Sequence, residues 1–258
     1  MPSQNDIKQF LRRFFISPEA INAEDPEITG SEAGHICRVL RLSIGDVVEL
    51  FDGTGKVYRA RIVSAFPKQV RFAIMESLVP PTESSVSITL AQGVLKDRKM
   101  DDLIRQTTEL GIDRWMPFYA ARSVPVPGKK GIGARLERWE KIAIEAVKQC
   151  RRGRVPQIAP AEKFDDMLAA AAGSDLKIIF WEGAAQTFDI PWTAPSKPKN
   201  IMVAIGPEGG FDPGEVRQAQ AHGFLAAGLG PRILRAETAT LAACTLVQCR
   251  FGDMGPEG

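Results

Sequence analysis

The stretch NIMVAIGPEGGFDPGEVRQAQAHGFLAAGLGPRILRAETA, residues 200–239, decides the fold class of this chain. It contains two apolar segments, residues 200–206 and 224–230, and a loop rich in glycine and proline follows each one. Residues 212–215, DPGE, combine a capping aspartate, a proline at the first helical position and a glutamate three residues after the cap, which predicts a helix from there to Gly223. Apolar strands that alternate with helices indicate a parallel α/β sheet.

The sequence around this stretch continues the same alternation. Apolar runs that predict strands are SITLAQGV, RWMPF and LKIIFW, at residues 87–94, 114–118 and 176–181. Apolar residues at helical spacing predict helices over residues 97–110, 134–150 and about 236–250. The C-terminal part of the chain is therefore expected to be an α/β domain.

A different pattern precedes residue 80. Short β-rich segments, VVELFD, VYRARIVSA and KQVRFAIM, occupy residues 47–52, 57–65 and 68–75. They predict a compact barrel or a curled sheet. Residues 79–85, VPPTESS, join adjacent prolines to small polar side chains and form the best candidate for a domain boundary. We expect a β-rich domain at residues 1–80 and an α/β domain at residues 81–258.

Composition fits an ordinary globular protein, with 44% hydrophobic residues, 25% charged residues and a net charge of +2. No apolar run approaches the roughly 18 residues that cross a bilayer. Residues 1–15 lack the apolar core of a signal peptide, so we expect a cytoplasmic protein with no membrane partner. No CxxC pair indicates a disulfide scaffold or a zinc site among the four cysteines, which are Cys37, Cys150, Cys244 and Cys249.

The two loops, IGPEGGF at residues 205–211 and LGPRILRAETA at residues 229–239, are the strongest functional signals. Each follows an apolar strand, so both are expected at the carboxyl edge of the sheet, where open α/β folds bind ligands. The glycines at 206, 209 and 210 permit positive φ and close approach of the backbone to a flat adenine ring. Two tight structural turns are the alternative. A P-loop and a GxGxxG after the first α/β strand are absent from the sequence, which argues against kinase and conventional dinucleotide-binding functions.

Together, GPEGGF and LGPRILRAETA resemble the signature of the SPOUT-class methyltransferases that modify the N3 nitrogen of a uridine in 16S ribosomal RNA. The resemblance extends to RRFFI, HICRVLRLSIGDVVELFDG, KDRKMDDLIRQTTELGI, WEKIAIEAVKQCRRGRVP and RFGDMG, and so covers nearly the whole chain. It implies a small PUA-like β-barrel domain that binds RNA, a SPOUT-type α/β domain with a trefoil knot, and a homodimer. It also implies S-adenosylmethionine as the cofactor and no need for a metal.

The resemblance places the cofactor in the two loops, with the end of LKIIFWE as a third wall. Ala236 stands where similar sequences often have threonine, which puts one side-chain hydroxyl contact in doubt, and Cys37 stands where glycine is common. The cofactor-binding residues expected on this basis are Glu182, Ile205, Gly206, Glu208, Gly209, Gly210, Leu229, Gly230, Ile233, Leu234, Ala236 and Thr238.

Methyl transfer to uridine N3 needs a base or a cation, because N3 is a weak acid that is neutral at pH 7. Arg232 and Arg235 flank the second loop and are candidates for stabilising a negative uracil edge or holding a phosphate, with a structural ion pair as the alternative. Glu237 and Glu208 are candidate bases, although carboxylates at such positions often serve as helix caps. His222 precedes Gly223 and is expected to be a surface or cap residue.

Basic residues gather in two parts of the chain, and the resemblance makes both of them candidate RNA contacts. His35, Arg38 and Arg41 form H-x-x-R-x-x-R, which on a helix brings the side chains near one face. With Arg13 they are expected to hold RNA backbone, which positions a substrate without reading its sequence. An exposed basic helix face is the alternative. A second cluster, expected near the cofactor domain, comprises Lys148, Arg151, Arg152 and Arg154.

The expected activity is transfer of a methyl group from S-adenosylmethionine to the N3 nitrogen of a uridine, in free 16S ribosomal RNA or in the small ribosomal subunit. One alternative is an RNA-binding ribosome assembly factor that has lost catalysis, which the intact glycines of both loops disfavour. Another is a related methyltransferase that acts on the ribose of transfer RNA. The β-rich N-terminal domain and the RRFF start favour the ribosomal class.

Overall fold

The computed structural model of this chain describes residues 11–78, 83–96, 98–124, 132–184, 188 and 197–255. The described chain divides into two compact units, each with its own sheet and core. The first unit takes in the chain up to Thr82 together with Lys148–Val155, and the second comprises Glu83–Val147 and Pro156–Gly258. The boundary predicted after residue 80 falls in residues 79–82, which lie outside the described residues.

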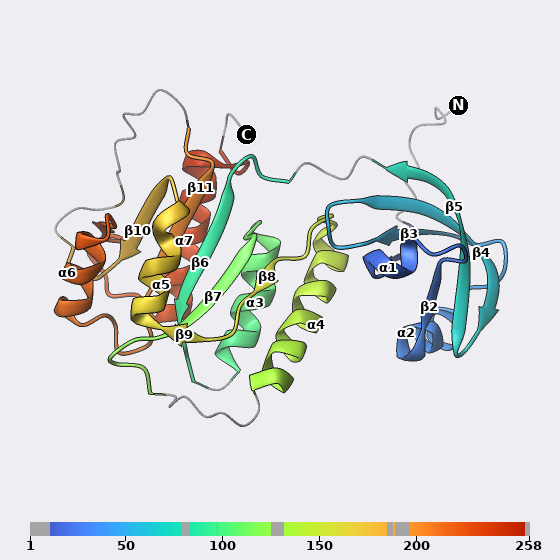
Figure 1. Cartoon of the computed structure of the whole chain (residues 1–258), viewed down its shortest axis with the longest axis horizontal. Helices are drawn as coiled ribbons and strands as arrows, with labels where there is room; N and C mark the ends of the chain where they lie inside the picture. The colour runs from blue at the N-terminus through green and yellow to red at the C-terminus, as the bar shows by residue number, and fades with distance from the viewer. Residues whose placement is uncertain are drawn as a thin grey trace. The chain divides into compact units, whose positions relative to one another are not determined.

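The first unit is built on a five-stranded mixed sheet with the order β1-β3-β4-β5-β2 (Figure 1). The strands β3, β4 and β5 pair antiparallel and correspond to the three predicted β-rich segments, whereas β1 runs parallel to β3 and was not predicted. The bounds are β1 (Arg13–Phe15), β2 (Glu27–Thr29), β3 (Val47–Phe51), β4 (Val57–Phe66) and β5 (Gln69–Leu78). Three short helical segments complete the unit, namely α1 (Pro18–Ile21), α2 (Gly30–Gly34) and the π-helical η1 (His35–Val39).

In the turn between β3 and β4, the side chain of Asp52 accepts hydrogen bonds from groups that have no partner on a neighbouring strand. The carboxylate of Asp52 accepts hydrogen bonds from the backbone N–H and the hydroxyl of Thr54, each at 2.8 Å. Gly53 and Gly55 both have positive φ, which few other residues tolerate. The strands so joined bury alternate side chains in one core, which includes Phe14, Leu50, Ile62 and Phe72.

The segment Lys148–Val155 packs in the first unit, although the sequence analysis placed its basic residues near the cofactor domain. The reason is a set of ion pairs and bridges inside that unit. The ammonium of Lys148 lies 2.8 Å from a carboxylate oxygen of Glu32, and Arg151 pairs with Glu49 at 2.7 Å. Arg154 forms an isolated β-bridge with Gly53, in the turn between β3 and β4.

The second unit contains a parallel sheet with the order β12-β10-β11-β6-β7-β8, and β9 also pairs with β7 (Figure 1). Each pairing in it is parallel, as predicted for apolar strands that alternate with helices. The bounds are β6 (Ser87–Gly93), β7 (Arg114–Tyr119), β8 (Gln157–Ile158), β9 (Glu162–Lys163), β10 (Leu176–Phe180), β11 (Asn200–Ile205) and β12 (Leu225–Ala227).

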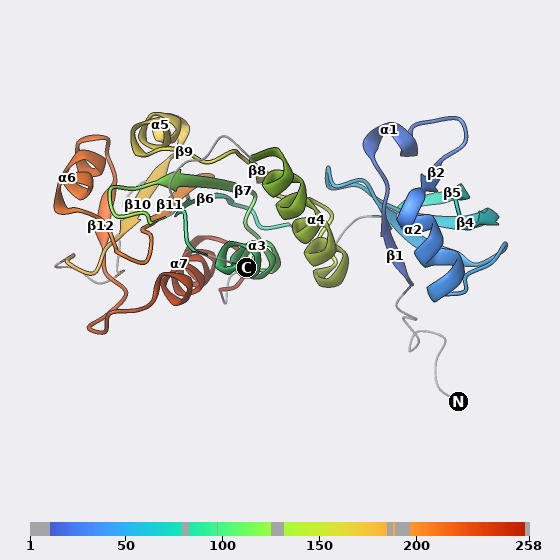
Figure 2. The ribbon, with the colours of Figure 1, turned by 90° about the horizontal axis from the view of Figure 1, so that it is seen from below.

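Helices cover both faces of this sheet, α3 and α7 on one face and α5 and α6 on the other (Figure 2). α6 begins in the predicted capping box between Asp212 and Glu215, and it ends just before Gly223, whose φ is +85°. Asp97, the predicted start of the helix that became α3, lies outside the described residues. The bounds are α3 (Lys99–Glu109), α4 (Ile132–Cys150), α5 (Phe164–Ala170), the 3-10 helix η2 (Ala171–Gly173), α6 (Pro213–Ala221) and α7 (Ala236–Phe251).

The apolar strands explain why the second unit needs helices on both sides. Ile178, Val203 and Leu90 are fully buried in three neighbouring strands, and Trp115 is fully buried in the next. The indole N–H of Trp115 donates to the hydroxyl of Thr107 in α3 at 2.7 Å, so this large side chain is buried without an unpaired donor. The carboxyl ends of the strands are thereby held on a rigid base.

Candidate functional site

Three strands end side by side at the carboxyl edge of the parallel sheet. Phe180, the last residue of β10, is in register with Ile205 at the end of β11 and with Ala227 at the end of β12. The loops that follow all three strands therefore begin at one place, and two of them are the predicted loops at residues 205–211 and 229–239. The placement follows from the parallel topology alone.

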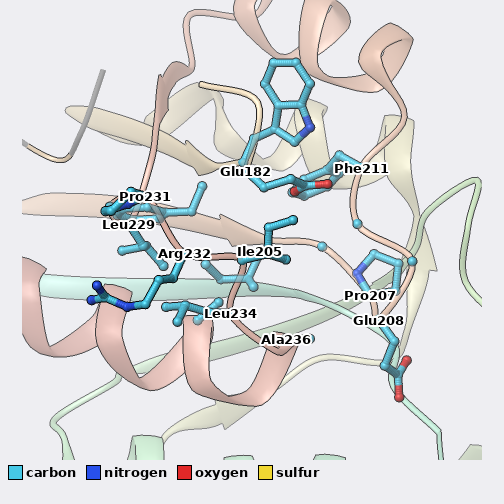
Figure 3. Close-up of a pocket in the computed structure, with 18 residues that line it drawn as sticks. Glu182, Ile205, Pro207, Glu208, Phe211, Leu229, Pro231, Arg232, Leu234 and Ala236 are labelled. Carbon is cyan, nitrogen blue, oxygen red and sulfur yellow. The ribbon is translucent and has the colours of Figure 1, made fainter. Parts of the chain in front are cut away.

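These three loops enclose a pocket with about 830 Å³ of space, a part of which is open to solvent (Figure 3). The structure brings together eleven of the twelve predicted cofactor residues, and Thr238 lies outside the pocket. The eleven that line it are Glu182, Ile205, Gly206, Glu208, Gly209, Gly210, Leu229, Gly230, Ile233, Leu234 and Ala236.

The third wall predicted at the end of LKIIFWE is present, with Phe180 at the end of β10 and Trp181 directly after it. Sequence reasoning did not single out two other lining residues, Phe211, which follows the glycines, and Ala239, in the first turns of α7. Phe211 is 1% exposed, and its ring stacks on Phe118 with centroids 6.1 Å apart, so it joins the pocket to the core.

The glycines of the loops have different reasons to be glycine. Gly210 has a φ of +68°, and a Cβ placed on it would lie 2.7 Å from a carboxylate oxygen of Glu182. Gly230 has a φ of +94°, but open space surrounds its Cβ position. The prediction of positive φ was wrong for Gly206 and Gly209, which owe their identity to crowding: a Cβ would lie 3.2 Å from Gly210 and 2.9 Å from Arg122, respectively.

A fully buried glutamine ties both loops to the sheet. Gln92, in β6, donates from its side-chain amide to the carbonyl of Gly206 at 3.3 Å, and its amide oxygen lies 2.6 Å from the hydroxyl of Thr240 in α7. The same hydroxyl lies 2.8 Å from the carbonyl of Ala236, where the second loop enters the helix. Buried amides of this kind are costly to leave unpaired, so Gln92 fixes the distance between the two walls of the pocket.

A lysine that the sequence analysis did not single out joins the same two loops from outside. The ammonium of Lys99, in the first turn of α3, lies 3.2 Å from Glu208 and 3.4 Å from Glu237. Burial raises the pKa of Glu208, but the N–H of Lys96 at 3.1 Å and the Lys99 ammonium lower it further, so the pKa lies below its ordinary value. The hydrogen bond with Glu208 in turn raises the pKa of Lys99.

The candidate catalytic residues are distributed unevenly around the pocket. Arg232 lines it and is exposed at its rim, and Figure 3 shows its side chain beside Leu229 and Leu234. Arg235 is the N-cap residue of α7 and lies outside the pocket lining. Glu237 also lies outside it, in the ion pair with Lys99. In Figure 3 the Glu182 carboxylate lies next to Phe211, whereas Glu208 turns away from the other labelled residues.

The candidate RNA contacts of the first unit are only partly brought together. His35 and Arg38 are exposed on the helical turn η1, but Arg41 follows that turn with a φ of 54° and so does not continue the helix face. Arg13 is 4% exposed: its guanidinium lies 2.9 Å from Glu49 and over the ring of Phe51. The contact with RNA expected of Arg13 is contradicted by this burial.

The cap prediction for His222 is confirmed. His222 is the exposed C-cap residue of α6, and its ring nitrogen Nδ1 lies 2.9 Å from the carbonyl of Gln218. Within the described ranges, helices that could span a membrane and clusters of at least three metal-binding side chains are both absent.

Two family models match the two units of the chain. One, described as an RNA methyltransferase domain, matches residues 82–248, and the other, an RNA methyltransferase PUA domain, matches residues 28–75. A ribosomal RNA small subunit methyltransferase E from Bacillus subtilis is 31% identical over 245 residues, which cover 92% of this chain and 96% of that protein. Its counterpart from Buchnera aphidicola (Acyrthosiphon pisum) is 32% identical over 85% of both chains.

Solved structures agree with these sequence matches. The ribosomal RNA small subunit methyltransferase E from Neisseria gonorrhoeae, bound to S-adenosylmethionine, superposes with a TM-score of 0.83 at 30% identity and covers 94% of this chain and 99% of its own. A Legionella pneumophila protein in complex with the same cofactor has a TM-score of 0.84 at 32% identity, with the same coverage of both chains.

Proposed function

Because the chain belongs to the ribosomal RNA small subunit methyltransferase E family, we propose that it transfers a methyl group from S-adenosylmethionine to small-subunit ribosomal RNA. The observation that carries the proposal is the pocket at the joined ends of β10, β11 and β12. Two similar chains were solved with this cofactor bound, and their likeness covers more than nine-tenths of this chain. The acceptor that we propose, following the signature loops, is the N3 nitrogen of a uridine in 16S ribosomal RNA.

The residues of the pocket fit S-adenosylmethionine in their chemistry. Ile205, Leu229 and Leu234 offer apolar walls for an adenine ring, and the backbone of the two loops offers peptide donors and acceptors. The carboxylate of Glu182, beside the left-handed Gly210, suits the hydroxyls of a ribose or a positively charged amino group. When bound, this cofactor supplies a sulfonium methyl group that is already reactive, so the chain has to position the acceptor and exclude water.

We propose that Arg232 acts on the uracil. A uracil that loses its N3 proton carries negative charge on its ring edge, and a guanidinium at the rim of the pocket would stabilise it. Arg232 is exposed there, and no ion pair or hydrogen bond of its side chain is seen within the described chain. For Arg235, the N-cap residue of α7, we propose a contact with a phosphate of the same nucleotide, because it lies outside the lining of the pocket.

The two carboxylates proposed as bases are poor proton acceptors in this geometry. Glu208 accepts from Lys96 and Lys99, which lowers its pKa, and Glu237 shares the Lys99 ammonium. A base with a lowered pKa and engaged oxygens has a weak tendency to take the N3 proton. We therefore propose that both glutamates position the loops, and that the N3 proton leaves to water as the guanidinium of Arg232 stabilises the anion.

For the first unit we propose a contact with the backbone of the substrate RNA through His35, Arg38 and Arg41, which are all exposed. Arg13 and Arg151 serve instead to hold residues 148–155 against β3, since both pair with Glu49. Arg152 and Arg154 stay candidates for RNA contact from that segment. Cytoplasmic location, a homodimer and the trefoil knot of the α/β domain are further proposals, which follow from the family resemblance.

Two measurements test the proposed function. Calorimetric titration of the purified chain with S-adenosylmethionine should show binding at one site per chain, and its absence would favour a non-catalytic assembly factor. Small ribosomal subunits from cells that lack the gene should accept one methyl group, which mass spectrometry would locate on a uridine base. Methylation of transfer RNA ribose in place of ribosomal RNA would support the rival enzyme class.

A further inference from the structure

A second hollow of the α/β unit is lined by arginines that the proposed function leaves without a role. It has about 1010 Å³ of space, partly open to solvent, between the segment after β6, the start of α3 and the start of α4. Its lining includes three exposed arginines, Arg98, Arg135 and Arg138, and one carboxylate, Asp101. Among the described residues of the lining, three guanidinium groups and one carboxylate leave an excess of positive charge around an open cavity.

The contacts around the hollow hold two of these arginines in position. Asp101 pairs with Arg138 and accepts a hydrogen bond from the indole N–H of Trp139 at 3.1 Å. Trp139 is 3% exposed, and the guanidinium of Arg135 lies over its ring, 5.9 Å from the centroid. The one acidic group of the lining is therefore used to fix the floor of the hollow, and the guanidinium of Arg135 is not neutralised by it.

The backbone at Arg98, the third arginine, is also held by hydrogen bonds. The carbonyl of Arg98 accepts from the backbone N–H groups of Asp101 and Asp102, at 3.0 and 3.3 Å, as α3 begins. Its side chain is exposed and lines the hollow. Arg98 and Arg135 thus bring two cations to one cavity from elements that are far apart in the sequence.

The hollow is adjacent to the cofactor pocket through one short segment. Lys96 and Lys99, on either side of Arg98, both contact Glu208 of the first loop, at 3.1 and 3.2 Å. Glu208 itself lines the cofactor pocket. The residues on either side of Arg98 therefore contact the first loop of the cofactor pocket.

We propose that this hollow, defined by Arg98, Arg135 and Arg138, binds a backbone phosphate of the substrate RNA close to the target nucleotide. Arginine suits phosphate because its planar fork donates two parallel hydrogen bonds. A phosphate contact positions the strand and carries no sequence information, so it complements the readout of the base in the cofactor pocket. The proposal rests on the proposed function, because it names the part of that same substrate that the α/β unit holds.

The test compares the double variant Arg98→Ala, Arg135→Ala with Arg105→Ala. Arg105 is an exposed arginine of the same helix α3, paired with Asp102 and outside the hollow, so it controls for the loss of a surface charge. Arg138 is left in place because it pairs with Asp101. Methylation is followed at increasing concentrations of small ribosomal subunits that lack the modification, and binding of their RNA is measured from low to high salt.

The double variant should raise the KM for the subunits about 10-fold or more, which corresponds to one lost contact of about 1.4 kcal/mol. The slope of log K against log salt should fall by about 0.7 for each lost contact to a single-stranded phosphate. The kcat and the affinity for S-adenosylmethionine should stay at the wild-type values, and Arg105→Ala should change none of these quantities. Lysine at positions 98 and 135 should restore the salt slope and only part of the affinity.

Two results would overturn the phosphate site. One is a double variant whose KM and salt slope match those of Arg105→Ala, and the other is a double variant that loses affinity for S-adenosylmethionine, since that would make the arginines part of the cofactor site. Failure of the proposed function looks different, because the wild-type chain would then bind no cofactor or methylate no ribosomal RNA while its RNA binding could still be measured.

Discussion

Gln92 and Lys99 hold both loops of the cofactor pocket, but the two loops differ in how many of their residues are held. The first, after β11, is fixed at almost each residue: Gln92 donates to Gly206, Lys96 and Lys99 contact Glu208, and the capping box of α6 follows. The second, after β12, exposes its side chains, and Ile233 is 86% exposed although it lines the pocket. Both loops are rich in glycine, so composition alone would have made them look alike.

This difference indicates that the two loops have different roles, a contrast called the division of work below. A loop whose backbone is fixed before binding loses little conformational entropy when the cofactor binds, which favours affinity. A wall that presents exposed side chains can reach a substrate, and Arg232 lies on this second loop. We therefore expect changes in the first loop to reduce cofactor binding and changes in the second to reduce the rate of transfer.

The largest effect is expected from Gly210→Ala, with Gly230→Ala as its matched control. Both glycines have positive φ, so alanine costs roughly 1–2 kcal/mol of strain at either position. At Gly210 the new Cβ would also lie 2.7 Å from Glu182, whereas nothing lies within 4 Å of it at Gly230.

The flexible carboxylate of Glu182 can move away from the new Cβ, but it lines the pocket, so Gly210→Ala should weaken S-adenosylmethionine binding more than Gly230→Ala, by up to about tenfold, which corresponds to 1.4 kcal/mol. Titration calorimetry of both variants measures the difference. Equal losses of affinity would mean that the two loops are held equally firmly, and the contrast between them would be lost.

The second effect concerns the buried link between the loops. Gln92→Leu leaves the carbonyl of Gly206 without its partner in an interior site, which costs about 1–3 kcal/mol of unfolding free energy, while the hydroxyl of Thr240 keeps the carbonyl of Ala236 as its acceptor. Thr240→Val should cost a similar amount, because it leaves the buried amide oxygen of Gln92 without its donor. Urea unfolding of the two single variants and of the double variant gives the coupling energy, which should be about 0.5 kcal/mol or more. Additive losses would show that Gln92 does not connect the loops.

Much of the α/β unit is predictable because its signals are local. The capping box at Asp212, the left-handed Gly223 and the apolar strands each follow from a few neighbouring residues. The pocket residues follow too, since the ends of parallel strands must meet at one edge. Thr238 was misplaced because α7 begins at Ala236, which turns the next side chains toward α3 and away from the pocket.

The features that could not be predicted depend on contacts between residues that are distant in the sequence. Gln92 and Thr240 are 148 positions apart, and Arg13 and Arg152 are 139 apart, so no local pattern indicates either pair. Arg13 looked like an RNA contact because charge is visible in a sequence and burial is not. The π-helical turn at His35–Val39 likewise changes the spacing that an ordinary helix would have given to Arg41.

The third effect is a difference in kcat and in cofactor affinity between variants that affect the two loops. Arg232→Ala should lower kcat by about tenfold, less than the roughly 100-fold typical of an enclosed donor to an oxyanion, because Arg232 is exposed. Its affinity for S-adenosylmethionine should stay within twofold of the wild type, roughly the error of such titrations. Arg122→Ala is the matched variant for the first loop: Arg122 follows β7, and its guanidinium lies 3.3 Å from the carbonyl of Gly209 and 3.4 Å from Asp212. It should weaken cofactor binding and spare kcat, and the reverse pattern would contradict the division of work.

The smallest effect is a dependence of stability on pH that belongs to the first loop alone. The pKa of Glu208 is lowered in the folded chain, so its ionised form adds stability above the ordinary glutamate pKa of 4.5, and this contribution is lost as the pH falls through the folded value. Glu208 is partly exposed, so screening limits the gain to a few tenths of a kcal/mol, as for other pairs near the surface.

Urea unfolding of the wild type and of Glu208→Gln should therefore differ at pH 7 and converge toward pH 3. Arg232→Ala, on the second loop, should leave this pH profile unchanged. A wild-type profile that coincides with that of Glu208→Gln at each pH would show that the ion pair does not hold the first loop, and that the hydrogen bonds of Gln92 and Arg122 hold it without help from charge.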